Sequence, residues 1–257
     1  MTGVFDDQYA AAYDAVYSDK DYAGECDALE SLIGRFGDGG IRRLLDLGCG
    51  TGRHAVHFAQ RGFQVLGVDR SEAMLVHAHQ RARASQLCEK VDFLRGDARD
   101  FSSGDKFDAV LMNFNVLGYM LTNDDVIGAL KSARGNVRDG GLLIADFWYG
   151  PAVVVDPPGT RRRQIEGPDG PMVRTSSGEH FPRQQSCAIT ISVGRMKGGR
   201  LVDETEEVHR VRYFFPLELE MLLRCNGFRL QALTGFPEVE TPPSEQKWVA
   251  ALVAAAQ

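Results

Sequence analysis

The segment 44–54, LLDLGCGTGRH, concentrates residues whose types could hold a small ligand. Asp46 lies two residues before Gly48, and Gly50 and Gly52 follow at alternate positions. Glycines let a backbone turn sharply and approach a bound molecule closely, because they lack a Cβ atom. The spacing lacks the two-residue gap before the last glycine that is typical of a dinucleotide-binding turn. Asp46 instead stands where a carboxylate could hold a free amino group.

Two further acids follow later apolar runs and extend this pattern. Asp69 ends FQVLGVD, where its carboxylate could accept hydrogen bonds from both hydroxyls of a ribose. Asp97 follows VDFLRG, where it could accept a hydrogen bond from the exocyclic amine of an adenine. These positions indicate a site at the ends of several strands.

Short apolar runs alternate with amphipathic segments from Ile41 onward, and this alternation predicts the elements that position the acids. Ser71 and Glu72 predict a helix cap followed by an acid in the first turn. The order strand, helix, strand predicts a doubly wound, mostly parallel α/β sheet with right-handed crossovers and helices on both faces. The strand candidates are 41–48, 63–69, 91–97, 107–113 and 141–147, and the helix candidates between them are 54–60, 71–84 and 123–137.

The first 36 residues have helical spacing and predict two short helices. Tyr9, Tyr13 and Tyr17 recur on one face, and residues 37–40, GDGG, end the helical pattern. Tyr13, Tyr17 and Tyr22 could form part of a lid over a ligand. Alternatively, they could simply pack the first helix on the sheet.

The second half of the chain does not continue the alternation of strands and helices. Residues 151–171 are rich in Pro, Gly and Arg, which predicts a loop or linker. Residues 185–196 and 201–215 alternate in polarity, and Gly198-Gly199 between them predicts a hairpin. The expected closing elements are a helix that begins at Pro216 and ends at Gly227, and strands over 229–233 and 247–253. We therefore divide the chain into an N-terminal helical lid (1–36), a cofactor-binding core (37–150), an inserted antiparallel β element (151–215) and the end of the core sheet (216–257).

Composition excludes several classes of protein. The 257 residues are 44% apolar and 25% charged, as in ordinary globular proteins. A formal charge of −6 without a long basic stripe argues against nucleic acid as a partner. Five scattered cysteines without a Cys-x-x-Cys spacing predict reduced thiols in a cytoplasm and no metal site. The N-terminus MTGVFDDQYA does not look like a signal peptide, and no apolar run is long enough to span a membrane.

The motifs DLGCGTG, VLGVDRS, FLRGDARDF and FDAVLMNFNVLGYM, in this order, resemble those of the class I S-adenosylmethionine-dependent methyltransferases. The resemblance covers about residues 41–146. It implies a seven-stranded Rossmann-like sheet with a small inserted antiparallel β element, and S-adenosyl-L-methionine as the cofactor. Methyl transfer from a sulfonium is an in-line displacement, for which an enzyme must chiefly position two partners and exclude water.

The same resemblance implies roles for individual residues. Asp46 and the glycine loop would surround the methionine part of the cofactor, and Asp69 would hold its ribose. Asp97 and Ala98 would contact the adenine, with Met74 packed on its face. The residues expected to bind the cofactor are Tyr13, Tyr22, Asp46, Gly48, Cys49, Gly50, Asp69, Arg70, Met74, Asp97, Ala98, Arg99, Met112 and Asn113.

A narrower resemblance is to the N-methyltransferases that act on nucleotide-linked 3-amino sugars. It rests on Tyr13-Asp14 with Tyr17 and the following Lys-Asp-Tyr, on residues 146–149 after the fifth strand, and on Val208-His209. Residues 113–116, Asn-Phe-Asn-Val, depart from the Ser-Ser of that family. The resemblance implies the amine of a nucleotide-linked amino sugar as the first-choice acceptor, and it implies a homodimer.

An amine must be neutral to attack, so a carboxylate, His or Tyr should take its proton or orient it. The candidate catalytic residues are Tyr13, Tyr22, Trp148 and His209. Trp148 follows the fifth strand at the edge where such sheets bind ligands, and His209 either contacts the acceptor or is structural. The run Arg161-Arg162-Arg163 could grip a diphosphate or could simply be solvated.

Other functions stay open at this point. Within the methyltransferases, the alternative is O- or C-methylation of another metabolite, such as a polyketide or a phenol. A nicotinamide-dependent oxidoreductase is disfavoured by the glycine spacing. A non-catalytic cofactor-binding protein would keep the same acids without turnover. The inserted hairpin could cap the active site or form a dimer contact.

Overall fold

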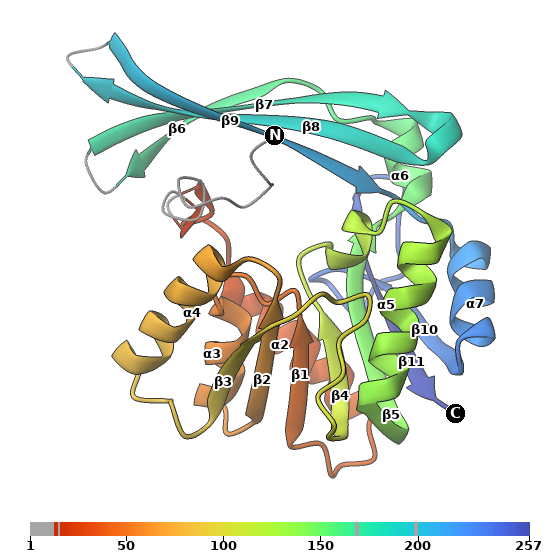
Figure 1. Ribbon diagram of the computed structural model, residues 1–257. Coiled ribbons are helices and arrows are strands. Elements are labelled where there is room, and N and C mark those ends of the chain that lie inside the picture. Colours follow the sequence, from red (N-terminus) through yellow and green to blue (C-terminus); the bar gives the residue numbers. More distant parts are fainter. Residues whose placement is uncertain (1–12, 15, 168–169, 198–199) are drawn as a thin grey trace.

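The computed structural model describes residues 13–14, 16–167, 170–197 and 200–257, which form two β-sheets (Figure 1). The larger sheet has seven strands in the order β10-β11-β5-β4-β1-β2-β3. Strands β1 to β5 pair in parallel, and only β11 runs against both of its neighbours. The doubly wound, mostly parallel seven-stranded sheet is therefore confirmed. Its strands are β1 (Arg43–Leu47), β2 (Gln64–Asp69), β3 (Val91–Arg95), β4 (Phe107–Met112), β5 (Val137–Trp148), β10 (Phe228–Gly235) and β11 (Val249–Ala256).

Helices cover both faces of this sheet. Helices α2, α3 and α4 pack through one apolar cluster, and α5 and α7 pack through a second cluster on the opposite face (Figure 1). Helix α4 begins where expected, because the Ser71 side chain accepts a hydrogen bond from Met74 N at 3.3 Å. The helices are α2 (Tyr22–Phe36), α3 (Arg53–Gln60), α4 (Glu72–Ala84), α5 (Asn123–Asn136), α6 (Gly150–Val155) and α7 (Pro216–Cys225), with short 3-10 turns η1 (Val116–Tyr119) and η2 (Pro182–Gln184).

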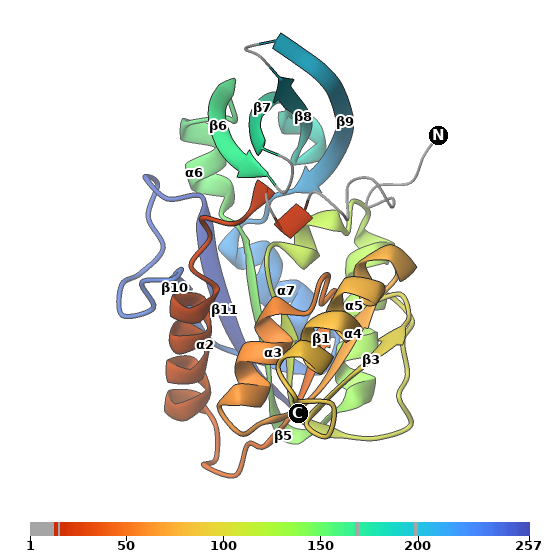
Figure 2. The same ribbon diagram turned by 90° about the vertical axis from the view of Figure 1, so that its left-hand side faces the viewer.

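The smaller sheet is antiparallel and lies over the carboxyl ends of the parallel strands of the larger one (Figure 2). Its strands, in this order, are β6 (Arg161–Gly167), β7 (Gly170–Phe181), β8 (Ser186–Lys197) and β9 (Arg200–Arg212). The predicted pairing of the last two strands is confirmed, since β8 and β9 form an antiparallel ladder. The predicted turn at Gly198-Gly199 lies outside the described residues, as does Tyr9.

The prediction that residues 151–171 form a loop or linker is wrong. Helix α6 begins at Gly150, and Pro151 fits its first turn because a backbone N–H is not needed there. Strand β6 then pairs along its whole length with β7, from Arg161 opposite Ser176 to Gly167 opposite Gly170. The Arg-rich run is therefore part of a strand. Among the described residues, no helix is both long and apolar enough to cross a membrane.

Candidate active site

The ends of the parallel strands enclose a cavity of about 340 Å³ beneath the smaller sheet. Its floor comes from residues that follow β1 to β5, and the inner face of β7, β8 and β9 supplies its roof. The strand order reverses between β1 and β4, which is where open α/β sheets bind ligands. The volume is that of a small-molecule site.

The loop after β1 is held in a fixed shape. Gly48 N and Cys49 N donate to Val68 O at 2.7 and 3.0 Å. Gly48 has φ +80°, and a Cβ added there would lie 2.5 Å from Val116 Cγ2. Glycine is therefore required at this position both by the backbone conformation and by the neighbouring side chain. Gly48 and Gly50 of this loop line the large cavity.

Asp46 and Asn113 form a buried polar pair beside this loop. Asn113 Nδ2 donates to Asp46 Oδ1 at 3.2 Å, and the two residues are 4% and 2% exposed, respectively. Asp46 Oδ2 and Asn113 Oδ1 have no hydrogen-bond partner among the described residues. Both residues line a small cavity of about 30 Å³ that adjoins the larger one. Burial raises the pKa of Asp46 to about 6. Two bare acceptor oxygens in such a place suit a cationic group with N–H donors.

Asp69 and Asp97 line the other side of the large cavity. Asp69 accepts hydrogen bonds from Gly50 N and Ser71 N, both at 2.9 Å, and so joins the glycine loop to the start of α4. Asp97 forms a bidentate pair with Arg99, at 2.6 and 2.9 Å, and these hydrogen bonds lower the pKa of Asp97. Among the described residues, Asp69 is therefore a fixed carboxylate without an ion pair, whereas Asp97 already has a cation on both oxygens.

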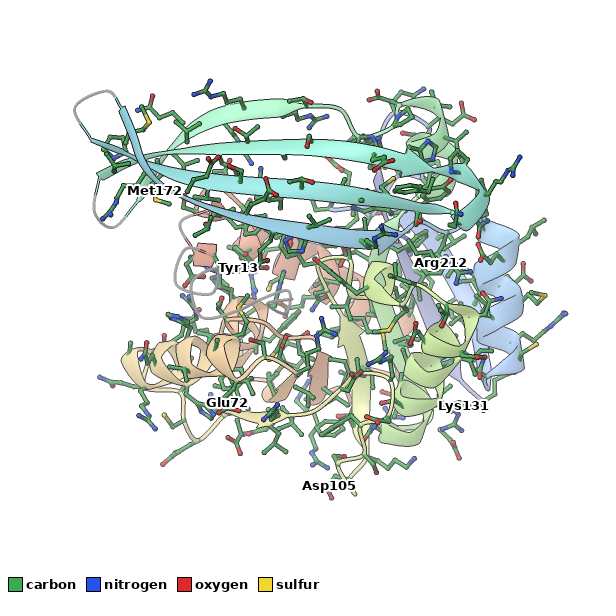
Figure 3. All side chains as sticks on the ribbon, turned by 45° about the horizontal axis from the view of Figure 1, so that its top comes forward. Tyr13, Glu72, Asp105, Lys131, Met172 and Arg212 are labelled. Carbon is green, nitrogen blue, oxygen red and sulfur yellow. The ribbon has the colours of Figure 1, made fainter. Side chains whose placement is uncertain are left out.

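The N-terminal segment places aromatic rings over this edge. Tyr13 lies between the smaller sheet and the core (Figure 3) and packs on Met74. The Tyr17 ring lies 4.8 Å from that of Tyr13 and 5.0 Å from that of Phe114. The same segment is anchored by Asp14, which contacts Thr51, Arg53 and Arg81. Aromatic side chains therefore cover the cavity from the N-terminal side.

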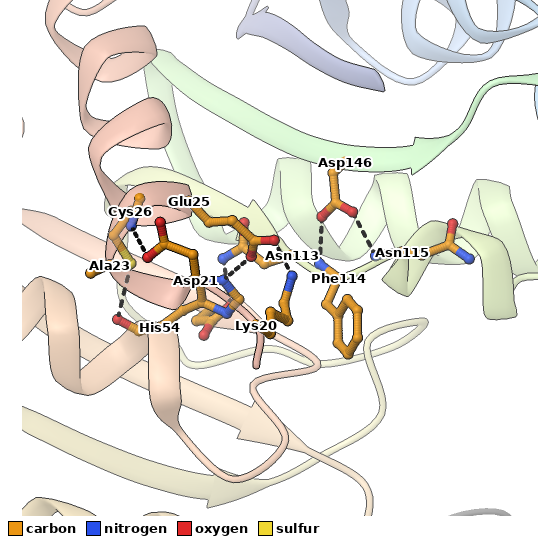
Figure 4. Close-up of polar contacts among 12 residues, drawn as sticks. Lys20, Asp21, Ala23, Glu25, Cys26, His54, Asn113, Phe114, Asn115 and Asp146 are labelled. Atoms are coloured by element: carbon orange, nitrogen blue, oxygen red, sulfur yellow. Dashed lines mark hydrogen bonds and ion pairs between the residues drawn. The ribbon is translucent and has the colours of Figure 1, made fainter. Parts of the chain in front are cut away.

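A second anchor joins the start of α2 to the site (Figure 4). Glu25 accepts a hydrogen bond from His54 Nε2 at 2.9 Å and pairs with Lys20, whose Nζ lies 4.3 Å from the centre of the Phe114 ring. Burial opposes the charge of Glu25, but the His54 hydrogen bond and the Lys20 charge outweigh it and lower the pKa of Glu25. Tyr22, whose hydroxyl is buried, lies against His54 at the small cavity.

The turn after β4 is held by Asp146 from the neighbouring strand. Phe114 and Asn115 have φ values of 62° and 59°, which non-glycine residues rarely adopt. Asp146 Oδ1 accepts from Phe114 N, and Oδ2 accepts from Asn115 N at 2.9 Å (Figure 4). Asn115 Oδ1 in turn accepts from Trp148 N at 3.2 Å. These hydrogen bonds therefore hold the ends of β4 and β5 together at the cavity wall.

The roof side of the cavity carries polar groups from the smaller sheet. Tyr119 Oη and His209 Nδ1 are 3.0 Å apart, and His209 Nε2 lies 3.2 Å from Glu207 Oε2. The Arg174 guanidinium lies 5.5 Å from the Tyr17 ring centre, and its buried Nε has no hydrogen-bond partner among the described residues. This end of the cavity therefore has a Tyr–His pair and an arginine cation that the cofactor motifs do not account for.

Most of the predicted site residues lie together in the structure, and their individual roles stay predictions. Met112 is the exception, because it is fully buried in the apolar core beneath α5 and lines neither cavity. The predicted residues that line the large cavity are Tyr13, Gly48, Gly50, Asp69, Arg70, Met74, Asp97, Ala98, Arg99, Asn113, Trp148 and His209, and Tyr22, Asp46 and Cys49 line the small one.

Sequence reasoning gave no role to Tyr119, Glu207 or Arg174. Tyr119 stands near the end of the motif FDAVLMNFNVLGYM, so a search for His or Tyr along the whole motif would have found it. Glu207 stands two residues before His209, so the period of a strand could have paired them on one face. Arg174 has no local signal, because only the pairing of β6, β7 and β8 places it at the cavity.

Comparison with known proteins agrees with this geometry. A family model described as "Methyltransferase domain" matches residues 44–141. The chain is 30% identical to the dTDP-3-amino-3,4,6-trideoxy-alpha-D-glucopyranose N,N-dimethyltransferase of Streptomyces venezuelae, over 91% of this chain and 95% of that protein. It is 29% identical to the dTDP-3-amino-3,6-dideoxy-alpha-D-glucopyranose N,N-dimethyltransferase of Streptomyces fradiae, over 90% of this chain and 87% of that one. The crystal structure of Streptomyces venezuelae DesVI is similar with a TM-score of 0.79 and 26% identity, covering 97% and 98% of the two chains. The chain therefore belongs to the class I S-adenosylmethionine-dependent methyltransferases.

Proposed function

We propose that this methyltransferase transfers a methyl group to the amine of a small acceptor, with the amino group of a nucleotide-linked amino sugar as first choice. The observation that carries the proposal is the cavity wall under the smaller sheet, where the rings of Tyr17, Phe114 and Trp148 accompany a Tyr–His pair. Aromatic faces stabilise a cationic amine. In the described part of the chain, the carboxylates that line the large cavity are Asp69, at the end of β2, and Asp97, after β3. That wall therefore suits an amine better than a phenol or a polyketide, which needs a strong base.

The residues of the sheet edge fit S-adenosyl-L-methionine. The bare buried oxygens of Asp46 and Asn113 suit the ammonium group of its methionine part, and Asp69 suits its ribose hydroxyls. When bound, the cofactor supplies an electrophilic methyl group on a sulfonium. The chain positions this group and the acceptor, and Tyr13 and Tyr17 exclude water from the space between them.

The proposed acceptor class is tested by mass spectrometry of methyl transfer to a panel of substrates. The panel contains nucleotide-linked 3- and 4-amino sugars, with phenolic and polyketide acceptors alongside. A gain of one or two methyl masses on an amino sugar supports the proposal, as do the names of the two relatives, which specify dTDP-linked amino sugars. Methylation of the phenols or polyketides alone would contradict the amine and favour the O- or C-methyltransferase alternative.

Affinity for the cofactor is expected to depend on pH through Asp46. Its pKa is raised to about 6 by burial, so the carboxyl holds a proton below that pH in the protein without ligand. A bound ammonium group favours the ionised form and expels the proton, so affinity should rise about tenfold between about pH 5 and pH 7 and level off above. Calorimetry in two buffers of different ionisation enthalpy measures the proton release directly.

The control for this pH dependence is Asp46→Asn, which should bind the cofactor more weakly and without proton release. Asp146, whose pKa burial also raises to about 6, keeps its two backbone donors and should not contribute. Equal proton release by the wild type and Asp46→Asn would mean that another group titrates.

An anionic part of the acceptor fits the roof of the cavity. The strand register places Arg163 directly opposite Arg174, so the two side chains share one face of the smaller sheet. Arg161 shares this face two residues away and lies 5.4 Å from the Trp248 ring centre, whereas Arg162 belongs to the opposite face. Arg163 already pairs with Asp19. We therefore assign the diphosphate of a nucleotide-linked acceptor chiefly to Arg174, in place of the whole Arg161-Arg162-Arg163 run.

Arg174→Gln is expected to raise KM for a nucleotide-linked acceptor by about 10- to 100-fold, with kcat changed little. A charge-assisted hydrogen bond is worth about 1.5–3 kcal/mol, and it binds the ground state and the transition state alike. Steady-state kinetics with the charged acceptor checks this, with Arg162→Gln as the matched control. An unchanged KM in Arg174→Gln would remove this residue from acceptor binding.

Loosening the N-terminal segment is expected to weaken cofactor binding without abolishing it. Asp14 accepts hydrogen bonds from Thr51 Oγ1 at 3.0 Å and Arg53 Nε at 2.9 Å, and it also pairs with Arg81. Burial opposes the charge of Asp14, but the Arg53 hydrogen bond and the two cations hold its pKa below the usual value. Asp14→Asn should therefore raise the Kd for the cofactor about tenfold and hasten proteolysis of the segment. Asp19→Asn is the control, and equal affinities of the two variants would contradict an anchoring role.

We further propose a cytoplasmic location and a homodimer, as expected from the sequence. All five cysteines are free, which fits a reducing compartment. Sedimentation of the purified chain measures the oligomeric state, and a monomer at all concentrations would exclude the homodimer.

A further inference from the structure

Three polar side chains at the roof of the cavity form a continuous chain. Tyr119, at the end of η1, lines the cavity, and its hydroxyl oxygen is 3.0 Å from His209 Nδ1. His209 on β9 is 4% exposed and also lines the cavity. Glu207 lies two residues earlier on the same strand and so on the same face, with Oε2 3.2 Å from His209 Nε2. Each group is therefore within reach of the next.

These contacts indicate the direction of the hydrogen bond between Tyr119 and His209. The Glu207 carboxylate lies at ion-pair distance from His209 Nε2 without the geometry of a hydrogen bond, and its charge favours the tautomer in which that nitrogen carries the hydrogen. Nδ1 is then an acceptor, so Tyr119 donates its O–H to His209. Tyr119 lines the cavity, and its hydroxyl oxygen can in turn accept an N–H from a molecule there. The chain thus runs from the cavity through Tyr119 and His209 to Glu207.

We propose that Tyr119, His209 and Glu207 form a proton relay that converts the ammonium form of the acceptor into the neutral amine before methyl transfer; this rests on the proposed amine acceptor. The N–H bond of the ammonium breaks, and its proton goes to the Tyr119 oxygen while the Tyr119 proton passes to His209 Nδ1. The nitrogen keeps its electron pair and becomes a nucleophile. The resulting imidazolium is stabilised by the Glu207 carboxylate, and it returns its proton through Tyr119 to water after the product has left.

Tyr119 is the catalytic residue of this relay, and His209 and Glu207 are positioning residues that hold the proton behind it. Burial raises the pKa of Tyr119. The nearby groups of Tyr17, Glu207 and Asp69 raise it further, whereas Arg70 opposes them. The phenol therefore stays protonated and cannot act as a base by itself. It moves a proton only because His209 accepts on its other side.

Tyr119→Phe tests the relay through its pH dependence. At about pH 7 we expect kcat for an amino-sugar acceptor to fall about 100-fold, which is the usual contribution of a positioned proton acceptor. The defect should shrink as pH rises, because an amine that is already neutral needs no relay. The control is Tyr213→Phe, which removes another Tyr–His hydrogen bond of 3.0 Å, to His180, from a pair that does not line the large cavity.

Glu207→Gln tests the far end of the relay, with the exposed Glu206→Gln as its control. We expect a loss of about tenfold that is again greatest at low pH. Nitrogen NMR of the histidine rings, which needs no acceptor, should show hydrogen on Nε2 of His209 in the wild type. Melting temperatures and cofactor affinity establish that each variant is folded.

The outcomes separate the relay from the proposed function. If the wild type methylates no amine, the proposed function fails and the relay fails with it. If the wild type is active but Tyr119→Phe loses nothing, or loses the same factor at every pH, the acceptor class stands and the relay is wrong. Hydrogen on Nδ1 of His209 in the NMR experiment would also overturn it.

Discussion

Replacing Asp69 with Asn is expected to weaken binding of S-adenosyl-L-methionine by at least about 100-fold. The carboxylate accepts two backbone hydrogen bonds of 2.9 Å, from Gly50 and Ser71, and its remaining lone pairs suit the ribose hydroxyls. An Asn side chain has one acceptor oxygen, and its amide group would face an N–H donor. Each charge-assisted hydrogen bond is worth about 1.5–3 kcal/mol, so the loss of two corresponds to about 3 kcal/mol or more. Calorimetric titration with the cofactor and with S-adenosylhomocysteine measures the change.

The matched control for this variant is Asp92→Asn, an exposed aspartate on the neighbouring strand β3. It should bind the cofactor as the wild type does. The melting temperature of Asp69→Asn without cofactor separates a general loss of fold from a local loss of binding. An affinity within about twofold of the wild type would show that Asp69 only supports the glycine loop.

The core sheet could be predicted because its strands are short apolar runs separated by turns and helices. Helices cover both faces, so Leu44, Leu45 and Leu47 of β1 are all fully buried, and such runs are easily recognised. Residues that are typical of helix caps also stand where the helices begin or end, as Ser71 does before α4 and Gly37 does after α2. Local sequence and tertiary packing favour the same structure there.

Strands β6 and β7 could not be predicted, because neither carries an alternating apolar pattern. The side chains along β7 are almost all half-buried, so their burial does not alternate between the two faces. The inner face of these two strands carries Arg161, Arg163 and Arg174, which look like solvated residues in the sequence. Their strand character comes from pairing with β8, whose Ile189 and Ile191 do alternate.

The site also has one part that the sequence predicts and one part that it does not. Its cofactor side follows from acids and glycines that stand at strand ends, so position along the chain already predicts position in space. The acceptor side joins residues far apart in sequence: Tyr119 lies 3.0 Å from His209, and Arg174 lies 5.5 Å from the Tyr17 ring. These neighbours depend on how the smaller sheet lies over the core, which no local pattern contains.

The turn after β4 depends on one buried carboxylate, and this makes Asp146 the most critical residue of the wall. Asp146 is 4% exposed, and both of its oxygens accept backbone hydrogen bonds from Phe114 and Asn115. Both of those residues have positive φ, a conformation that costs about 1 kcal/mol or more at each non-glycine residue. The strained turn persists because the carboxylate satisfies its amides. Without that carboxylate, the same backbone has strain and two unpaired donors.

Asp146→Ala is therefore expected to lower the free energy of unfolding by about 3–5 kcal/mol, because each buried N–H left without a partner costs about 1–3 kcal/mol. Urea unfolding followed by circular dichroism measures this loss. Asp146→Asn keeps one acceptor and should fall between Asp146→Ala and the wild type. Asp139→Ala, an exposed position on the same strand, should change stability by less than about 0.5 kcal/mol. A loss below about 1 kcal/mol in Asp146→Ala would mean that water or another conformation of the turn satisfies the Phe114 and Asn115 amides.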